Sequence, residues 1–358
     1  MTEQEKRLFQ SLCSFQSKSF DRELLTAASP TVLGQLFFNR MQAVAYGTLA
    51  KNELLSAMNR EFRNSLKAAY ALNIEKNQSF FGCVRYLGKL LSGLGLNYAM
   101  LKGAYLCKLY PDGYSTSNDI DLLVAPENVT KIGKALVNAG FQQGYVRNEE
   151  FYPASRRQII ESKMMRGETV PYIKEMDLPQ MKFLEVDLNF SLDYKPNDGH
   201  AVGELLKNTE VKEIDGYKVC TLNDEDFLVH LCCHLYKEAT TLPWVEMKRD
   251  MTLYKYCDIY LLLNHADKQK TDRFFDRARV LGLEKICAFA VRGTAELFEF
   301  NNAHAVHTAD DILRDRPAFL HTVVSPKDKK TYEYSVSDIK ERLFSENRVD
   351  LLKEVKTP

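Results

Sequence analysis

Apolar residues recur at three- and four-residue spacing near both ends of the chain, which predicts helices there. The run from Leu33 to Leu72 contains no proline, and a second helix is expected from about Asn77 to Leu91, before Gly93 and Gly95. Asn223 is a suitable N-cap for the next helical stretch. Further segments at helical spacing follow it, namely FLVHLCCHLYKEA, MTLYKYCDIYLLLNHA and FFDRARVLGLEKICAFAVRGTAELFEF.

The middle of the chain follows a different pattern. Short apolar segments predict strands near residues 96–101, 119–125 and 183–192, with a helix between Pro126 and Gly140. Weaker signals indicate a hairpin near residues 141–147, a strand near 169–176 and a hairpin at 211–222 around Asp215-Gly216. The order of strands and helices predicts an α+β or α/β fold with a mixed sheet. We therefore expect a helical region at 1–93, a core at 94–222 and a second helical region at 223–358.

The composition narrows the class of protein. The chain has 358 residues, of which 45% are hydrophobic and 27% charged, as in an ordinary globular protein. The 48 basic and 48 acidic residues cancel, so no overall charge favours nucleic acid. No apolar stretch reaches the roughly 18 residues of a membrane span, and the N-terminus lacks the apolar segment of a secretory signal. We expect a cytoplasmic protein whose eight cysteines are reduced.

Two acidic strands carry the candidate chemistry. Side chains alternate along a strand, so Asp119 and Asp121 point the same way, about 7 Å apart. Such a pair favours a hard divalent cation, Mg²⁺ above all, between the carboxylates. Glu185 and Asp187 follow the same alternation in FLEVDLNFSL, and one of them completes a three-carboxylate site if the two strands are neighbours. The alternative is that these are merely the polar faces of half-exposed strands; we favour the metal site.

At these residues the sequence resembles a known family. The segments LKG, LY, DIDLLV and GF, followed by a strand with an aspartate, are similar to the uncharacterised bacterial nucleotidyltransferases of the DNA polymerase β-like superfamily. The resemblance spans about residues 30–265 and includes the helices before LKG and the segment GYKVCTLNDEDFLVHLCCHLYKE. It implies a nucleotidyltransferase-type core between helical regions.

The resemblance also implies roles for particular residues. Asp119 and Asp121 would be paired catalytic metal ligands, and Asp187, rather than Glu185, the third. Lys102-Gly103 would occupy the turn where the superfamily usually has Gly-Gly or Gly-Ser in contact with nucleotide phosphates. Glycine lets a backbone approach a phosphate closely, and Lys102 would add a point charge.

The sequence departs from the family just before the acidic pair. Many members carry an arginine there, whereas this chain has Ser115, Thr116, Ser117 and Asn118. We expect Ser115 and Ser117 to contact the nucleotide, because hydroxyls bind phosphate although they do not neutralise it.

The implied reaction is transfer of a nucleoside monophosphate to a hydroxyl with release of pyrophosphate. We expect two Mg²⁺ ions, with ATP or another nucleoside triphosphate as donor and AMP from ATP as the first choice. The acceptor would be a hydroxyl-bearing small molecule, a peptide or a protein, with neither membrane nor nucleic acid as partner. The missing arginine leaves open a non-catalytic nucleotide sensor or an antitoxin-like interaction protein on the same fold.

A histidine and cysteine cluster is a weaker candidate. His230, Cys233 and His234 share one face of a predicted helix, and two histidines so spaced suit zinc. No fourth ligand is evident, so core packing is favoured. Asp258 matches either a family aspartate or an ordinary exposed helix charge, and the two interpretations weigh equally.

Overall fold

The structure, a computed structural model, describes residues 1–15, 20–197, 199–214 and 216–355. It forms two compact units, one made of Met1–Ala71 with Leu231–Pro358 and the other of Leu72–His230. The boundaries differ from those expected at residues 93 and 222, because α4 (Arg60–Ser92) and α9 (Asp224–Ala239) each run through a boundary between units. The three-part division stays a prediction.

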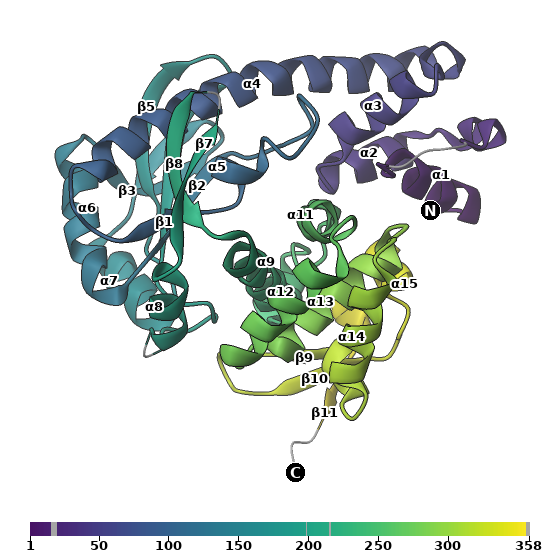
Figure 1. Cartoon of the computed structure of the whole chain (residues 1–358). Helices are drawn as coiled ribbons and strands as arrows, with labels where there is room; N and C mark the ends of the chain where they lie inside the picture. The colour runs from purple at the N-terminus through teal and green to yellow at the C-terminus, as the bar shows by residue number, and fades with distance from the viewer. Residues whose placement is uncertain (16–19, 198, 215, 356–358) are drawn as a thin grey trace. The chain divides into compact units, whose positions relative to one another are not determined.

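A six-stranded mixed sheet organises the unit Leu72–His230 (Figure 1). Its strand order is β1-β2-β6-β5-β3-β4, and β2 and β6 are parallel while all other neighbours are antiparallel. The strands are β1 (Tyr98–Met100), β2 (Asp119–Val124), β3 (Gln142–Arg147), β4 (Glu150–Pro153), β5 (Tyr172–Leu178) and β6 (Met181–Asn189). This mixed α/β architecture confirms the fold class expected from the sequence.

Helices and one hairpin complete this unit. The antiparallel strands β7 (Thr209–Ile214) and β8 (Tyr217–Leu222) form the predicted hairpin, although Asp215 of its turn lies outside the described residues. The helical segments are α5 (Gly103–Leu106), η3 (Pro126–Asn128), α6 (Val129–Asn138), α7 (Arg156–Met165) and α8 (His200–Leu206), besides α4 and the start of α9.

The core of the unit lies between α4 and the sheet. Phe80, Val84 and Leu87 of α4 are buried together with Ile120 and Val186 of the central strands. Figure 1 shows the second half of α4 passing across the strands. Burial on this face of the sheet is what fixes β2 and β6 so that their acidic residues face the other way.

The other unit is mainly helical. Its strands form a three-stranded sheet in the order β11-β10-β9. Its elements are α1 (Glu3–Leu12), η1 (Arg22–Ala27), α2 (Pro30–Phe38), α3 (Gln42–Lys51), η2 (Leu55–Ala57), α10 (Leu242–Glu246), α11 (Leu253–Leu263), α12 (Lys268–Val280), α13 (Glu284–Leu297), α14 (Ala303–Leu313), η4 (Pro317–Leu320), β9 (Thr322–Val324), β10 (Thr331–Tyr334), α15 (Ile339–Phe344), η5 (Arg348–Leu351) and β11 (Leu352–Val355), with the rest of α4 and α9.

The helix boundaries near the N-terminus differ from those expected. The chain leaves the helical conformation at Arg40 and Glu53, which both have positive φ, so the run from Leu33 to Leu72 is broken. The boundary expected near Asn77 was wrong, because neither glycine nor proline lies between Arg60 and Phe81 and α4 continues through it.

Two expectations about the whole chain concern membranes and thiols. None of the helices in the described part of the chain combines the length and apolar character that a membrane span requires. All eight cysteines belong to the described residues, and each is a free thiol.

Candidate active site

The parallel pairing of β2 with β6 brings the four acidic residues together. Asp119 lies opposite Glu185 in the register, and Asp121 lies opposite Asp187. The residues that alternate with them, among them Ile120, belong to the buried core. The two acidic strands are therefore neighbours, which was the condition set by the sequence, and the four carboxylates share one face of the sheet.

Asp121 is the most enclosed of the four, with 5% of its surface exposed. Its carboxylate is 2.8 Å from Nζ of Lys102 and accepts a hydrogen bond of 3.0 Å from Nδ2 of Asn189. Burial raises the pKa of Asp121, but the Lys102 ammonium, with smaller contributions from His230 and Asn189, lowers it below its ordinary value. Asp121 is thus ionised and already paired with a cation.

Glu185 and Asp187 have the opposite electrostatics. Burial, together with the charges of Asp119 and Asp121, raises the pKa of Glu185 to about 7. Burial is also the largest cause that raises the pKa of Asp187 well above its ordinary range. The charges of Asp121, Asp119 and Glu185 raise this pKa further, in decreasing order of effect. The face therefore holds more carboxylates than its cations can balance.

The residue types on this face of the sheet suit a hard divalent cation. The donors are carboxylate oxygens, which Mg²⁺ prefers, and the raised pKa of Glu185 and of Asp187 reports an excess of negative charge that a cation would relieve. In the described residues no three His, Cys, Asp or Glu side chains converge closely enough to hold a metal ion as they stand. The Asp121 carboxylate is directed to Lys102 instead, so a metal would require side chains to rotate.

A tight turn directs Lys102 at Asp121. Lys102 has φ 45° and ψ −120°, and the N–H of Ala104 donates to the carbonyl of Leu101 at 3.2 Å. These are the features of a type II′ turn with Lys102 at the position that favours glycine. A lysine there costs backbone strain, which its ion pair with Asp121 offsets.

Gly103 has a packing role that the sequence did not reveal. A Cβ atom on Gly103 would lie 1.8 Å from Oγ and 2.3 Å from Cβ of Ser117. The close approach that requires glycine is therefore to a side chain of this chain. It places Ser117, which is partly exposed, directly against the turn.

Helix α4 shapes the loop that leads into β2. Nδ2 of Asn73 donates to the carbonyls of Gly113 and Ser115 at 2.6 and 2.5 Å. Ser115 itself is buried, and its hydroxyl meets Sγ of Cys107 at 2.9 Å. Of the two serines expected to contact a nucleotide, Ser117 is the accessible one, whereas Ser115 packs inside the loop.

Lys76 is a basic residue near the acidic pair that sequence reasoning missed. Its Nζ donates to Oδ1 of Asn118, the residue that precedes Asp119. The two residues are 42 positions apart in the chain, so no local motif relates them. A cation from α4 thus lies beside the segment where the expected arginine is absent.

The histidines of α9 do not form a metal centre. His230 contributes to the electrostatics of Asp121, whereas Nε2 of His234 is 3.6 Å from a carboxylate oxygen of Glu238. No zinc cluster exists among the residues that the structure describes. Asp258 is partly exposed on α11, and its role stays a prediction.

Comparisons with known proteins point to one family. A family model described as "Uncharacterised nucleotidyltransferase" matches residues 29–299. Among solved structures, an antigenic nucleotidyltransferase-like protein from Paracoccidioides brasiliensis is similar, with 15% identity and a TM-score of 0.34 over 63% of this chain and 95% of that chain. None of the curated proteins compared matches the chain significantly.

The packing of Gly103 against Ser117 is testable. Gly103→Ala should lower the free energy of unfolding by about 1–3 kcal/mol, because the new methyl group overlaps Ser117. Adding Ser117→Gly should restore most of this loss. Gly82→Ala is the matched control, since a Cβ at Gly82 has nothing within 4 Å and alanine favours a helix. Urea unfolding of the wild type and the three variants measures these differences. A Gly103→Ala single variant as stable as the wild type would refute the close contact.

The raised pKa of Glu185 predicts how stability depends on pH without metal. The carboxyl holds its proton to about pH 7 in the folded chain but only to its ordinary value of 4.5 when unfolded. Between pH 4.5 and about 7 the folded state binds more protons than the unfolded state. The stability that this carboxyl contributes below pH 4.5 is therefore lost as the pH rises through about 7. Asp119→Asn should flatten this fall, because it removes the largest charge acting on Glu185. Urea unfolding with EDTA across this range measures both, and a wild-type stability that rises with pH would contradict the prediction.

Proposed function

This chain belongs to the uncharacterised nucleotidyltransferase family, and we propose that it transfers a nucleoside monophosphate, AMP from ATP in the expected case, to a hydroxyl acceptor with the help of Mg²⁺. The observation that carries the proposal is the register of β2 with β6, which sets Asp119 and Asp121 beside Glu185 and Asp187. Two pairs of carboxylates on adjacent strands form a donor set for divalent cations, which in turn would bind a triphosphate.

In this proposal Asp119, Asp121 and Asp187 would hold two Mg²⁺ ions, which would neutralise the charge of the triphosphate and lower the pKa of the acceptor hydroxyl. The hydroxyl oxygen forms a bond to the α-phosphorus while the bond to the pyrophosphate oxygen breaks, and the hydroxyl proton leaves to solvent or a carboxylate. Glu185 orients a ligand or accepts that proton; its role stays unassigned.

Basic residues of the chain handle the charge of the substrate. Lys102 pairs with Asp121 and would move to a phosphate oxygen if Asp121 turned to a metal. Lys76, held at Asn118, supplies a second ammonium close to the acidic strands. These two lysines would supply the positive charge that an arginine in the segment Ser115–Asn118 would otherwise provide. Ser117 and the backbone of Gly103 would add neutral contacts.

The acceptor is a hydroxyl-bearing small molecule, a peptide or a protein. Incubation of the chain with labelled ATP, Mg²⁺ and a cell extract should therefore produce both pyrophosphate and a labelled product. Binding of ATP without release of pyrophosphate under these conditions would instead favour a nucleotide sensor. No binding at all would refute both.

The metal ligands are tested by isosteric replacement. Asp119→Asn, Asp121→Asn and Asp187→Asn should each lower the rate of transfer by at least about a hundredfold, because each removes a ligand charge. Glu185→Gln should lower it only modestly. Rates are measured by pyrophosphate release at several Mg²⁺ concentrations; an inactive Glu185 variant beside an active Asp187 variant would make Glu185 the third ligand.

The same variants have separate effects on stability that serve as the control. Without metal, Asp187→Asn should stabilise the fold, since the charged form of Asp187 is disfavoured. Asp121→Asn should destabilise it, because the partner of Lys102 is lost. Loss of activity with these opposite changes in stability cannot be explained by unfolding.

Lys76 should contribute to nucleotide affinity. Lys76→Gln should raise the dissociation constant for ATP roughly tenfold, the value of one charge-assisted hydrogen bond, and Lys76→Arg should retain most of the affinity. Lys89→Gln, an exposed position on the same helix, is the matched control. Titration calorimetry with ATP and Mg²⁺ measures the effect, and equal affinities for the Lys76 and Lys89 glutamine variants would exclude Lys76 from the site.

A further inference from the structure

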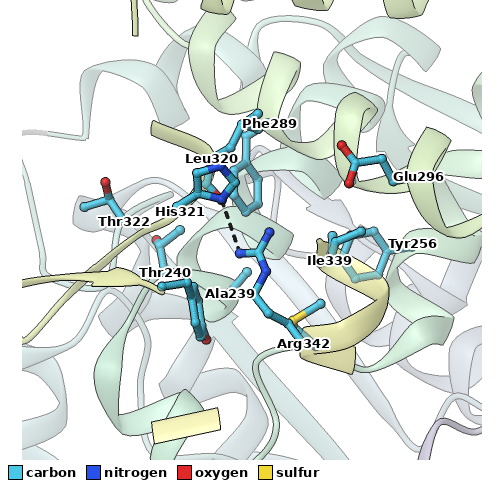
Figure 2. Close-up of a pocket in the computed structure, with 13 residues that line it drawn as sticks. Ala239, Thr240, Tyr256, Phe289, Glu296, Leu320, His321, Thr322, Ile339 and Arg342 are labelled. Carbon is cyan, nitrogen blue, oxygen red and sulfur yellow. Dashed lines mark hydrogen bonds between the residues drawn. The ribbon is translucent and has the colours of Figure 1, made fainter. Parts of the chain in front are cut away.

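A small cavity lies in the unit formed by Met1–Ala71 and Leu231–Pro358 (Figure 2). It is enclosed by α11, α13, α15 and the residues around the start of β9, which contribute Tyr256, Glu296, Arg342 and His321 among others. Its volume is about 30 Å³, enough for roughly two water-sized groups.

Arg342 is a buried cation at this cavity, with 6% of its surface exposed. Its Nη1 and Nη2 donate to the carbonyls of Leu320 and Ser337 at 3.4 and 3.2 Å, and the first contact is drawn in Figure 2. Nε has no hydrogen-bond partner, and the guanidinium lies 4.8 Å from the centre of the Tyr334 ring. Arg342 forms no ion pair with any carboxylate in the described ranges of the chain. Buried charges are ordinarily paired.

His321 presents a second unsatisfied group to the same cavity. Its Nδ1 is buried and has no hydrogen-bond partner in the part of the chain that is described. Burial, and then the charge of Arg342, lowers the pKa of His321, so the ring is neutral near pH 7. A neutral imidazole with its proton on Nδ1 would have one hydrogen bond to donate.

Charge and size select the kind of anion. Glu296 lines the same cavity, although its carboxylate is 3.3 Å from Nη2 of Arg292, and Asp338 also acts on Arg342. These negative charges disfavour a dianion more than a monoanion. Two water-sized positions match the two oxygens of a carboxylate and leave little room for the four oxygens of a phosphate.

We propose that this cavity binds the carboxylate of a small organic acid. Nε and one Nη of Arg342 would donate to its oxygens as a charge-assisted fork, and Nδ1 of His321 would donate to one of them. The bound carboxylate would form the direct ion pair that no carboxylate of the described residues forms with Arg342. None of the residues of this site belongs to the acidic strands.

Acetate is the probe, used with the full-length chain. Sodium acetate, titrated against sodium chloride at constant ionic strength, should raise the melting temperature by about 2 °C or more in a saturable way. It should also shift the imidazole resonance of His321, which is identified by its absence in His321→Asn. Arg342→Met should lose both responses, and Arg342→Lys, which keeps the charge without the fork, should weaken them. Arg314→Gln, on an exposed arginine of the same unit, should leave both unchanged.

Three results would overturn the proposal. Acetate that shifts the His321 resonance no more than chloride does would exclude a carboxylate site. Inorganic phosphate that binds as tightly as acetate would show that the site does not select a carboxylate. If Arg342→Met does not give a cooperative melt, Arg342→Lys decides, and an undiminished response to acetate in that variant would exclude Arg342.

Discussion

The parallel register of β2 with β6 is the constraint on which the candidate active site depends. It sets two carboxylates on each strand side by side, and charges so close in a partly buried position repel one another strongly. The surrounding residues respond to that repulsion. Lys102 and Asn189 bind Asp121, while the pKa of Glu185 and of Asp187 rises.

Much of this arrangement follows from local sequence rules, and the rest does not. The alternation of side chains along a strand was enough to place Asp119 with Asp121, and Glu185 with Asp187. The pairing of Asp121 with Asp187 was not predictable, because the register of two strands far apart in the chain is set by packing of the whole sheet. Similarly, no residue propensity marks Arg40 or Glu53 as a break between helices.

The surroundings of Gly103 and Asn118, where we propose that phosphate binds, were harder to predict. No cation lies immediately before Asn118 in the sequence, whereas the fold brings Lys76 there from α4. The contact of Gly103 with a nucleotide stays a prediction, and the nearest atoms to a Cβ at that position are those of Ser117. One contact joins α4 to the loop before β2, and the other joins α5 to the same loop. Local sequence patterns carry no information about contacts between such separate segments.

The ion pair of Lys102 with Asp121 has a thermodynamic consequence. The Lys102 ammonium competes with any divalent cation for Asp121, so a metal binding alone would have to break this ion pair. An anion arriving with the metal would receive the displaced ammonium at the type II′ turn. Each ligand then increases the affinity of the other by the same factor, as linkage requires. The ion pair at this turn would thus make the binding of cation and anion cooperative, and each would bind weakly without the other.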